Sequence, residues 1–143
     1  MKTTLLTPAS VEPLALPDAK AYLRVDYASD DDLIQSLIAS ARAQLEAEIA
    51  LCLISRRYLV EIEDWPICAP IKPPVQPVLA IESVMIDGVD HTPAFELEEV
   101  SLRSVIHSKD DPPPAIEDSA QFTLLVGLAA TPEDVPDDLH LAL

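Results

Sequence analysis

Apolar residues recur at three- and four-residue spacing through a long stretch of the first half of the chain. They are Leu33, Ile34, Leu37, Ile38, Ala41, Leu45 and Ile49. Polar residues occupy most of the positions between them, so that one side of the segment is apolar. This period is typical of a helix that packs on one side, and we expect an amphipathic α-helix of about 20 residues.

An acidic break precedes this helix, and a shorter helix is expected before the break, at residues 17–25, with a proline in its first turn. Ser29 lies three residues before Asp32, which is the spacing of a capping box. Carboxylates in a first turn also favour the positive end of the helix dipole. The aspartates are therefore expected to start the long helix. The alternative is a metal-dependent hydrolase built on Asp30, Asp31 and Asp32, which would need further converging ligands that the sequence does not show.

The second half of the chain changes to short apolar segments that tend to alternate with polar residues, as strands do. Strands are expected at residues 58–63, 80–86, 91–97, 101–106 and 122–126. The Asp87-Gly88 dipeptide between two of them is a hairpin-turn signal. Because helices come first and strands follow, the sequence predicts an α+β fold: a short helix, a long amphipathic helix and a small, mostly antiparallel sheet.

The remaining segments complete one expected domain, residues 1–143. Residues 1–15 contain two prolines and no clear period, and we expect an extended arm. Residues 107–118 are polar and rich in proline, which predicts a flexible loop. Proline and acids followed by leucines begin a short C-terminal helix at residue 136.

Charge is distributed unevenly along the chain. The net charge of the 143 residues is −16. Residues 1–60 hold eight acids and six bases, a net of −2, whereas residues 61–143 hold seventeen acids and three bases, a net of −14. A surface of this kind should not wrap nucleic acid, because phosphates are held by lysine and arginine. Simple solubility is the plainest reason for the charge.

Residues that could carry chemistry are few and scattered. The only glycines are Gly88 and Gly127, which cannot form a glycine-rich phosphate cradle. His91, His107 and His140 show no metal-ligand spacing with one another or with a cysteine. We therefore expect no catalytic residues, no metal site, no cofactor and no enzymatic activity.

The cysteines and the apolar runs indicate the cellular compartment in which the protein is made. Cys52 and Cys68 are a thin basis for a disulfide framework, and we expect free thiols, with Cys52 as a small core residue. No apolar run has the length of a membrane span or the form of a signal peptide. A reducing cytoplasm is the expected compartment of synthesis.

The order of these segments resembles that of a known family. The opening contains a short helix ending in Leu-Arg-Val-Asp, an acidic break and a long helix, in "LPDAKAYLRVDYASDDDLIQSLIASARAQLEAE". Three later segments follow in the same order: "LISRRYLVEIEDWP", "IKPPVQPVLAIESVMIDG" and "FTLLVGLAATPEDVPDDLHLAL". Together they are similar to the phage head–tail connector family, the head completion adaptors, which gene transfer agents also use.

The resemblance implies a structural protein of a phage-like particle. Such adaptors form a homo-oligomeric ring of about twelve copies. The ring lies between the portal protein and a tail-side stopper or terminator protein, and extends the DNA channel. Double-stranded DNA passes through it without specific binding, and no membrane is involved. The expected location is the head–tail junction of the virion, after assembly in the bacterial cytoplasm.

Two sets of residues gain candidate roles from this resemblance. Acidic residues of the second half would face the channel and keep DNA from sticking: Asp110, Asp111, Glu117 and Asp118. The leucines of the last segment, Leu139, Leu141 and Leu143, would dock on the portal. Packing of these leucines on the long helix is the alternative.

A second class of function fits the charge. An acidic inhibitor that mimics DNA would present carboxylates in a stripe on a rigid face and bind a basic partner. Such a mimic acts as a monomer or dimer, whereas an adaptor enters a large particle.

Overall fold

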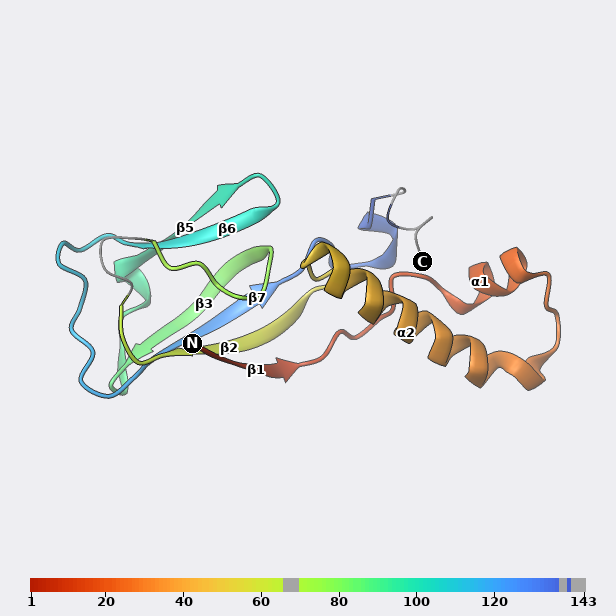
Figure 1. Ribbon diagram of the computed structural model, residues 1–143, viewed down its shortest axis with the longest axis horizontal. Coiled ribbons are helices and arrows are strands. Elements are labelled where there is room, and N and C mark those ends of the chain that lie inside the picture. Colours follow the sequence, from red (N-terminus) through yellow and green to blue (C-terminus); the bar gives the residue numbers. More distant parts are fainter. Residues whose placement is uncertain (66–69, 137–138, 140–143) are drawn as a thin grey trace.

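A computed structural model describes residues 1–65, 70–136 and 139 of the 143-residue chain. The molecule is elongated, with two helices at one end and a β-structure at the other (Figure 1). An α+β fold with one long helix and a mostly antiparallel sheet is therefore confirmed.

The helical end is a pair of helices joined by a short acidic break. Helix α1 (Leu16–Leu23) and helix α2 (Asp31–Ile49) flank a single 3₁₀ turn, η1 (Ala28–Asp30). Each α-helix ends at a residue in the left-handed conformation, Arg24 and Ala50, both with φ of 56°. That geometry closes the last turn and redirects the chain. Both helices lie where the sequence predicts them.

The main sheet has five strands in the order β1-β2-β7-β3-β4, all antiparallel to their neighbours. Its strands are β1 (Lys2–Thr7), β2 (Arg56–Ile62), β3 (Val78–Ile86), β4 (Val89–Asp90) and β7 (Ala120–Val126). A separate hairpin, β5 (Phe95–Val100) and β6 (Arg103–Ser108), lies over one face of the sheet (Figure 1). Two further 3₁₀ turns are η2 (Thr92–Ala94) and η3 (Pro132–Asp134).

Several predicted boundaries differ from the structure. The strand expected at residues 91–97 begins only at Phe95, because Thr92–Ala94 form the η2 turn. The expected arm, residues 1–15, contains the paired edge strand β1, because backbone hydrogen bonds to β2 hold a segment whose side chains bury nothing. The strand expected at 101–106 starts at Arg103, since Ser101 takes a positive φ of 61° in the hairpin turn. It continues to Ser108, so the loop predicted from residue 107 begins at residue 109.

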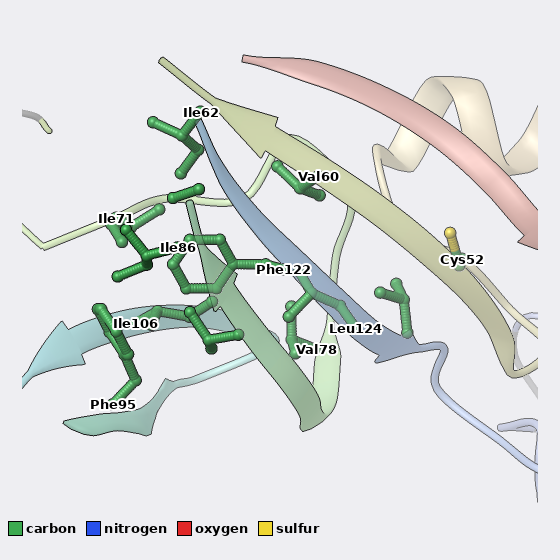
Figure 2. Packing of buried hydrophobic residues seen from close by; sticks show 13 residues of the cluster. Cys52, Val60, Ile62, Ile71, Val78, Ile86, Phe95, Ile106, Phe122 and Leu124 are labelled. Carbon is green, nitrogen blue, oxygen red and sulfur yellow. The ribbon is translucent and has the colours of Figure 1, made fainter. Parts of the chain in front are cut away.

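The main core lies between the sheet and the β5–β6 hairpin. Alternate residues of β7 point into it, including Phe122 and Leu124, and Ile106 of β6 closes it from the other side (Figure 2). The rings of Phe95 and Phe122 meet edge to face with centroids 5.3 Å apart. Cys52 is also buried, which confirms its predicted place in the core.

A second, smaller cluster and a charged network join the helices to the sheet. Leu53 and Ile54 follow α2 and are fully buried there. The carboxylate of Glu46 on α2 accepts hydrogen bonds from Arg42 (3.0 Å), from Arg56 of β2 and from the backbone N–H of Leu53 (2.8 Å). Because one side chain bonds to two elements, the direction in which α2 leaves the sheet is set by polar contacts as well as packing.

Gly127 lies in the same junction, directly after β7. A Cβ atom at this position would come within 2.6 Å of the backbone of Ser55, and its φ of +149° disfavours any other residue. Its N–H donates to the carbonyl of Pro77 at 2.9 Å. The close approach of two chain segments here therefore requires glycine.

Candidate functional site

The acidic break has a structural role in the fold. Lys20 of α1 donates to the Asp31 carboxylate at 2.5 Å and to the carbonyl of Tyr27 at 2.9 Å, which ties the break to both helices. The predicted capping box is wrong. Ser29 lies inside the η1 turn, and Asp30 takes the N-cap position without a side-chain cap hydrogen bond.

Clustered metal ligands are absent from the part of the chain that the structure describes. Within residues 1–65, 70–136 and 139, no group of three or more His, Cys, Asp or Glu side chains is placed to hold a metal ion. His107 lies on β6 beside Glu98, with 2.7 Å between Nε2 and a carboxylate oxygen, and His91 lies in the β4–η2 connection. None of the helices described in the same residues is long and apolar enough to cross a membrane.

Carboxylates gather at the end of the sheet farthest from the helices. The register pairs Ile62 of β2 with Ala120 of β7, and Ala120 with Ile86 of β3, so all three strands start or finish together. The residues just beyond these positions share that edge and are exposed: Glu63, Asp64, Asp87, Glu117 and Asp118. Asp110 and Asp111 are exposed on the loop that runs along the same end (Figure 1). We call these seven residues the acidic end.

Asp87 organises part of the acidic end. Its carboxylate accepts hydrogen bonds from the backbone N–H groups of Glu117 (2.8 Å), Asp118 (2.9 Å) and Ser119 (3.0 Å). These bonds, led by that from Glu117, lower the pKa of Asp87 below its ordinary value, because they favour the charged form. The side chain thus holds the loop against the β3–β4 turn. Asp87 and Gly88 both have positive φ, 49° and 82°, as the predicted hairpin turn requires.

The helical end carries a different surface. Tyr22 is 88% exposed, Tyr27 71% and Leu33 60%, and Leu23 and Leu37 are also exposed. We call these five residues the helical-tip face. The predicted apolar stripe of the long helix is thus only partly buried. Contact with α1 covers Ile34 and Ile38 together with Ala19, whereas Leu33 and Leu37 lie farther round α2 and face solvent.

The structure brings together only some of the residues singled out in the sequence. Asp110, Asp111, Glu117 and Asp118 all lie at the acidic end. Leu139 packs into the junction cluster, whose partly buried members include Leu45 and Ile49 of α2. Both roles of the C-terminal leucines, portal docking and packing on the long helix, therefore stay predictions. Leu141 and Leu143 lie outside the described residues.

Sequence reasoning missed two features of these surfaces. The additional carboxylates Glu63, Asp64 and Asp87 join the acidic end only through strand register, which the sequence pattern does not display. The exposure of the tyrosines was missed as well. The exposure of Tyr27 could have been predicted from its position in the polar break, because no apolar stripe continues through this segment.

Residues 14–89 match the family described as phage gp6-like head-tail connector protein. The match spans both helices, β2 and β3, more than half of the chain, and the chain belongs to this family. A comparison with curated proteins found no match.

Solved structures with the same fold come from gene transfer agent (GTA) particles. A chain of the neck of an empty GTA particle computed with C6 symmetry superimposes with a TM-score of 0.84 at 21% identity, over 99% of this chain and 78% of that one. A chain of the native GTA virion gives 0.85 at 20%, over 99% and 79%. A chain of the native neck computed with C12 symmetry gives 0.74 at 20%, over 99% and 78%. At these identities the likeness is one of fold.

Proposed function

We propose that this chain is a structural connector that forms a ring between the portal and the tail-side proteins of a phage-like particle. The observation that carries the proposal is the likeness of 99% of the chain to chains of solved particle necks, in a sequence that belongs to the head–tail connector family. The 12-fold symmetry of one of those necks supports about twelve copies in the ring.

The proposal has no catalytic step. Its partners are further copies of the chain, the portal protein and a tail-side stopper or terminator protein. The location is the head–tail junction of the particle, reached after assembly in the bacterial cytoplasm. Portal docking through the C-terminal leucines remains part of the proposal for Leu141 and Leu143, since Leu139 packs against the cluster of Leu53, Ile54, Ala129 and Val135.

The acidic end suggests how DNA passes. We propose that it faces the channel, with Asp110, Asp111, Glu117 and Asp118 among the charges that DNA meets. All four are exposed, and like charge keeps the phosphate backbone from binding as it moves. Double-stranded DNA would then pass through without specific contacts.

Electron microscopy tests the ring directly. The protein is mixed with the portal ring from the same source, and portal alone is the control. We expect added density on the outer end of the portal, coaxial with its channel. Folded protein that adds no density, but binds a basic nucleic-acid enzyme as a monomer or dimer at low salt, would contradict the ring and favour an acidic DNA mimic.

A further inference from the structure

A pocket lies beside the β5–β6 hairpin, under the loop that follows β6. Its volume is about 330 Å³, within the range of ligand pockets, about 300–1,000 Å³. Six of the ten described residues that line it are apolar: Trp65, Pro70, Ile71, Phe95, Ile106 and Pro113. Asp110 and Asp111 of the loop line it as well. The pocket thus combines an apolar, partly aromatic wall with two carboxylates.

The aromatic wall is held by the main core. Phe95 and Ile106 both belong to that core (Figure 2). The ring centroids of Trp65 and Phe95 are 5.7 Å apart, and Phe95 in turn packs edge to face on Phe122. The faces of such rings carry partial negative charge and attract cations, most strongly in tryptophan.

The loop that carries the two aspartates is tied to the rest of the protein on both sides. Before them, Lys109 donates its backbone N–H to the carbonyl of Ala94 (2.8 Å) and its ammonium group to the carbonyl of Pro93 (3.0 Å). After them, the indole N–H of Trp65 donates to the carbonyl of Pro114 at 2.7 Å. The pocket is therefore already formed, so a ligand need not order this loop to bind.

The carboxylates of Asp110 and Asp111 have no bonding partner among the residues that the structure describes, since only the backbone of Asp110 bonds to Ser108. No lysine or arginine belongs to the described lining of the pocket. His107 also lines it, but its Nε2 atom lies 2.7 Å from the Glu98 carboxylate. The negative charge of the two aspartates is thus unmatched within residues 1–65, 70–136 and 139.

Charge selects a cationic occupant. The chain carries a net charge of −16, of which −14 belongs to residues 61–143, so a basic protein is attracted to this site and a second copy is repelled. Among basic side chains, arginine fits the wall and the charge together. Its planar guanidinium stacks on aromatic rings and binds carboxylates through several N–H groups, and its apolar stem can lie on proline and isoleucine.

We infer that this pocket takes an arginine side chain presented by a basic partner protein. The chemistry of the site goes beyond the proposed ring and does not depend on it. In the assembled particle, an arginine bound there would neutralise Asp110 and Asp111. Glu117 and Asp118, which are not among the described lining residues, would remain as carboxylates that DNA meets.

The only tryptophan of the chain gives a direct measurement of binding. The full ¹⁵N-labelled protein has one indole N–H signal, that of Trp65, which is followed by NMR at neutral pH in about 0.15 M salt. The probe is the peptide acetyl-Gly-Arg-Gly-amide. The matched control peptide carries citrulline, which has nearly the shape of arginine without its charge. We expect a saturable shift of the indole signal, with at least about tenfold weaker binding of the citrulline peptide.

Two pairs of substitutions separate the pocket from the general charge of the acidic end. Asp110→Asn with Asp111→Asn should weaken binding of the arginine peptide by about tenfold and leave the melting curve unchanged, because these carboxylates hold no described residue. Glu117→Gln with Asp118→Asn removes the same charge from the same end and should change binding by less than about twofold.

The results of the titration decide the chemistry of the site. A saturable shift that is lost in the pocket pair and kept in the control pair supports the inference. Equal losses in the two pairs would show a general attraction to the acidic end and overturn it, as would the absence of a saturable shift in the folded wild-type chain. A lysine peptide that binds as tightly would overturn the choice of arginine.

A photo-crosslinker in place of Pro113 tests the partner in assembled particles, and this arm rests on the proposed particle location. We expect a crosslink to a different particle protein, mapped to a segment that contains arginine. The control carries the crosslinker in place of Leu102, which is 60% exposed on the hairpin and is not among the described lining residues. A crosslink to a second copy, or none, would overturn the choice of partner. Absence of the wild-type chain from particles would overturn the connector function, whereas the titration still decides the site.

Discussion

The helical end and the acidic end of this molecule differ in what they present to their surroundings. The first exposes Tyr22, Tyr27, Leu33 and neighbouring apolar side chains, and the second exposes carboxylates brought together by strand register. The exposed apolar side chains of the first and the carboxylates of the second thus lie at opposite ends of the elongated molecule. The junction between the two ends, built on Glu46 and Gly127, then sets how they are oriented.

The largest effect is expected from breaking the junction itself. Gly127→Ala places a Cβ atom 2.6 Å from the backbone of Ser55, and backbone atoms cannot move aside cheaply. We expect a loss of about 3 kcal/mol or more in the free energy of unfolding, measured by urea titration. Gly88→Ala is the control: its φ is also positive, but nothing lies within 4 Å, so it should cost about 1 kcal/mol. Equal costs would refute the close approach.

Reversing the charge of the acidic end should change function without unfolding the protein. With Asp110, Asp111, Glu117 and Asp118 all replaced by lysine, DNA is attracted to the surface that it should slide past. We expect DNA release from assembled particles to slow or stop, as followed by dye fluorescence after triggered ejection. Unchanged delivery would remove the channel role.

The comparison between the ends sharpens this test. Asp26→Lys with Glu48→Lys makes the same type of change at exposed positions of the helical end. Measured on particles with equal copy number, this pair should leave the rate of release unchanged, whereas Glu117→Lys with Asp118→Lys should reduce it.

Glu46→Gln weakens the junction less severely than the glycine change. The neutral amide loses its ionic bonds to Arg42 and Arg56, whose guanidinium groups are largely buried at this point. Arg42 keeps its ion pair with Glu12, but Arg56 loses its carboxylate partner at a buried position. We expect this loss to cost about 2–3 kcal/mol in the free energy of unfolding, measured by thermal or urea denaturation. Glu82→Gln, which breaks the exposed pair with Arg57, serves as the control and should change little.

Replacing Asp30, Asp31 and Asp32 with asparagine should have a smaller effect. The change removes the Lys20–Asp31 ion pair and negative charge from the start of α2, and we expect a loss of about 1 kcal/mol in stability. Incorporation into particles should be unaffected. A loss of a metal-dependent hydrolytic activity of the wild-type chain would instead support the hydrolase alternative.

The smallest effect is local and depends on pH. The folded pKa of Asp87 is lowered, so its contribution to stability is present above the unfolded value, near 3.8, and is lost as pH falls through the folded pKa. We expect the amide protons of Glu117, Asp118 and Ser119 to lose protection from hydrogen exchange in that acidic window. Asp87→Asn should lower their protection at neutral pH and abolish its change with pH. Protection that stays constant in the wild type would count against the three hydrogen bonds.

The spacing of apolar residues was sufficient to predict the long helix. It was insufficient to predict the cap of that helix and the pairing of strand β1. The periodicity from Leu33 to Ile49 predicts α2 because side-chain spacing along a helix depends only on its own geometry. The capping box at Ser29 failed because the η1 turn takes up Ala28–Asp30, which moves the N-cap of α2 from Ser29 to Asp30. Strand β1 was missed because it pairs through backbone groups, which leave no hydrophobic period in Lys2–Thr7.

The sequence by itself determined the two helices, the α+β class, the turn at Asp87-Gly88 and the concentration of acid in the second half, since these follow from neighbouring residues or from composition. Only the tertiary structure decided which carboxylates share one end and which part of the α2 stripe stays open. Both depend on contacts between segments distant in sequence: the pairing of Ile62, Ala120 and Ile86, and the narrow contact of α1 on Ile34 and Ile38. An apolar stripe in the sequence shows which side chains a helix could bury. Which of them are buried depends on the other segments of the fold that pack on the helix.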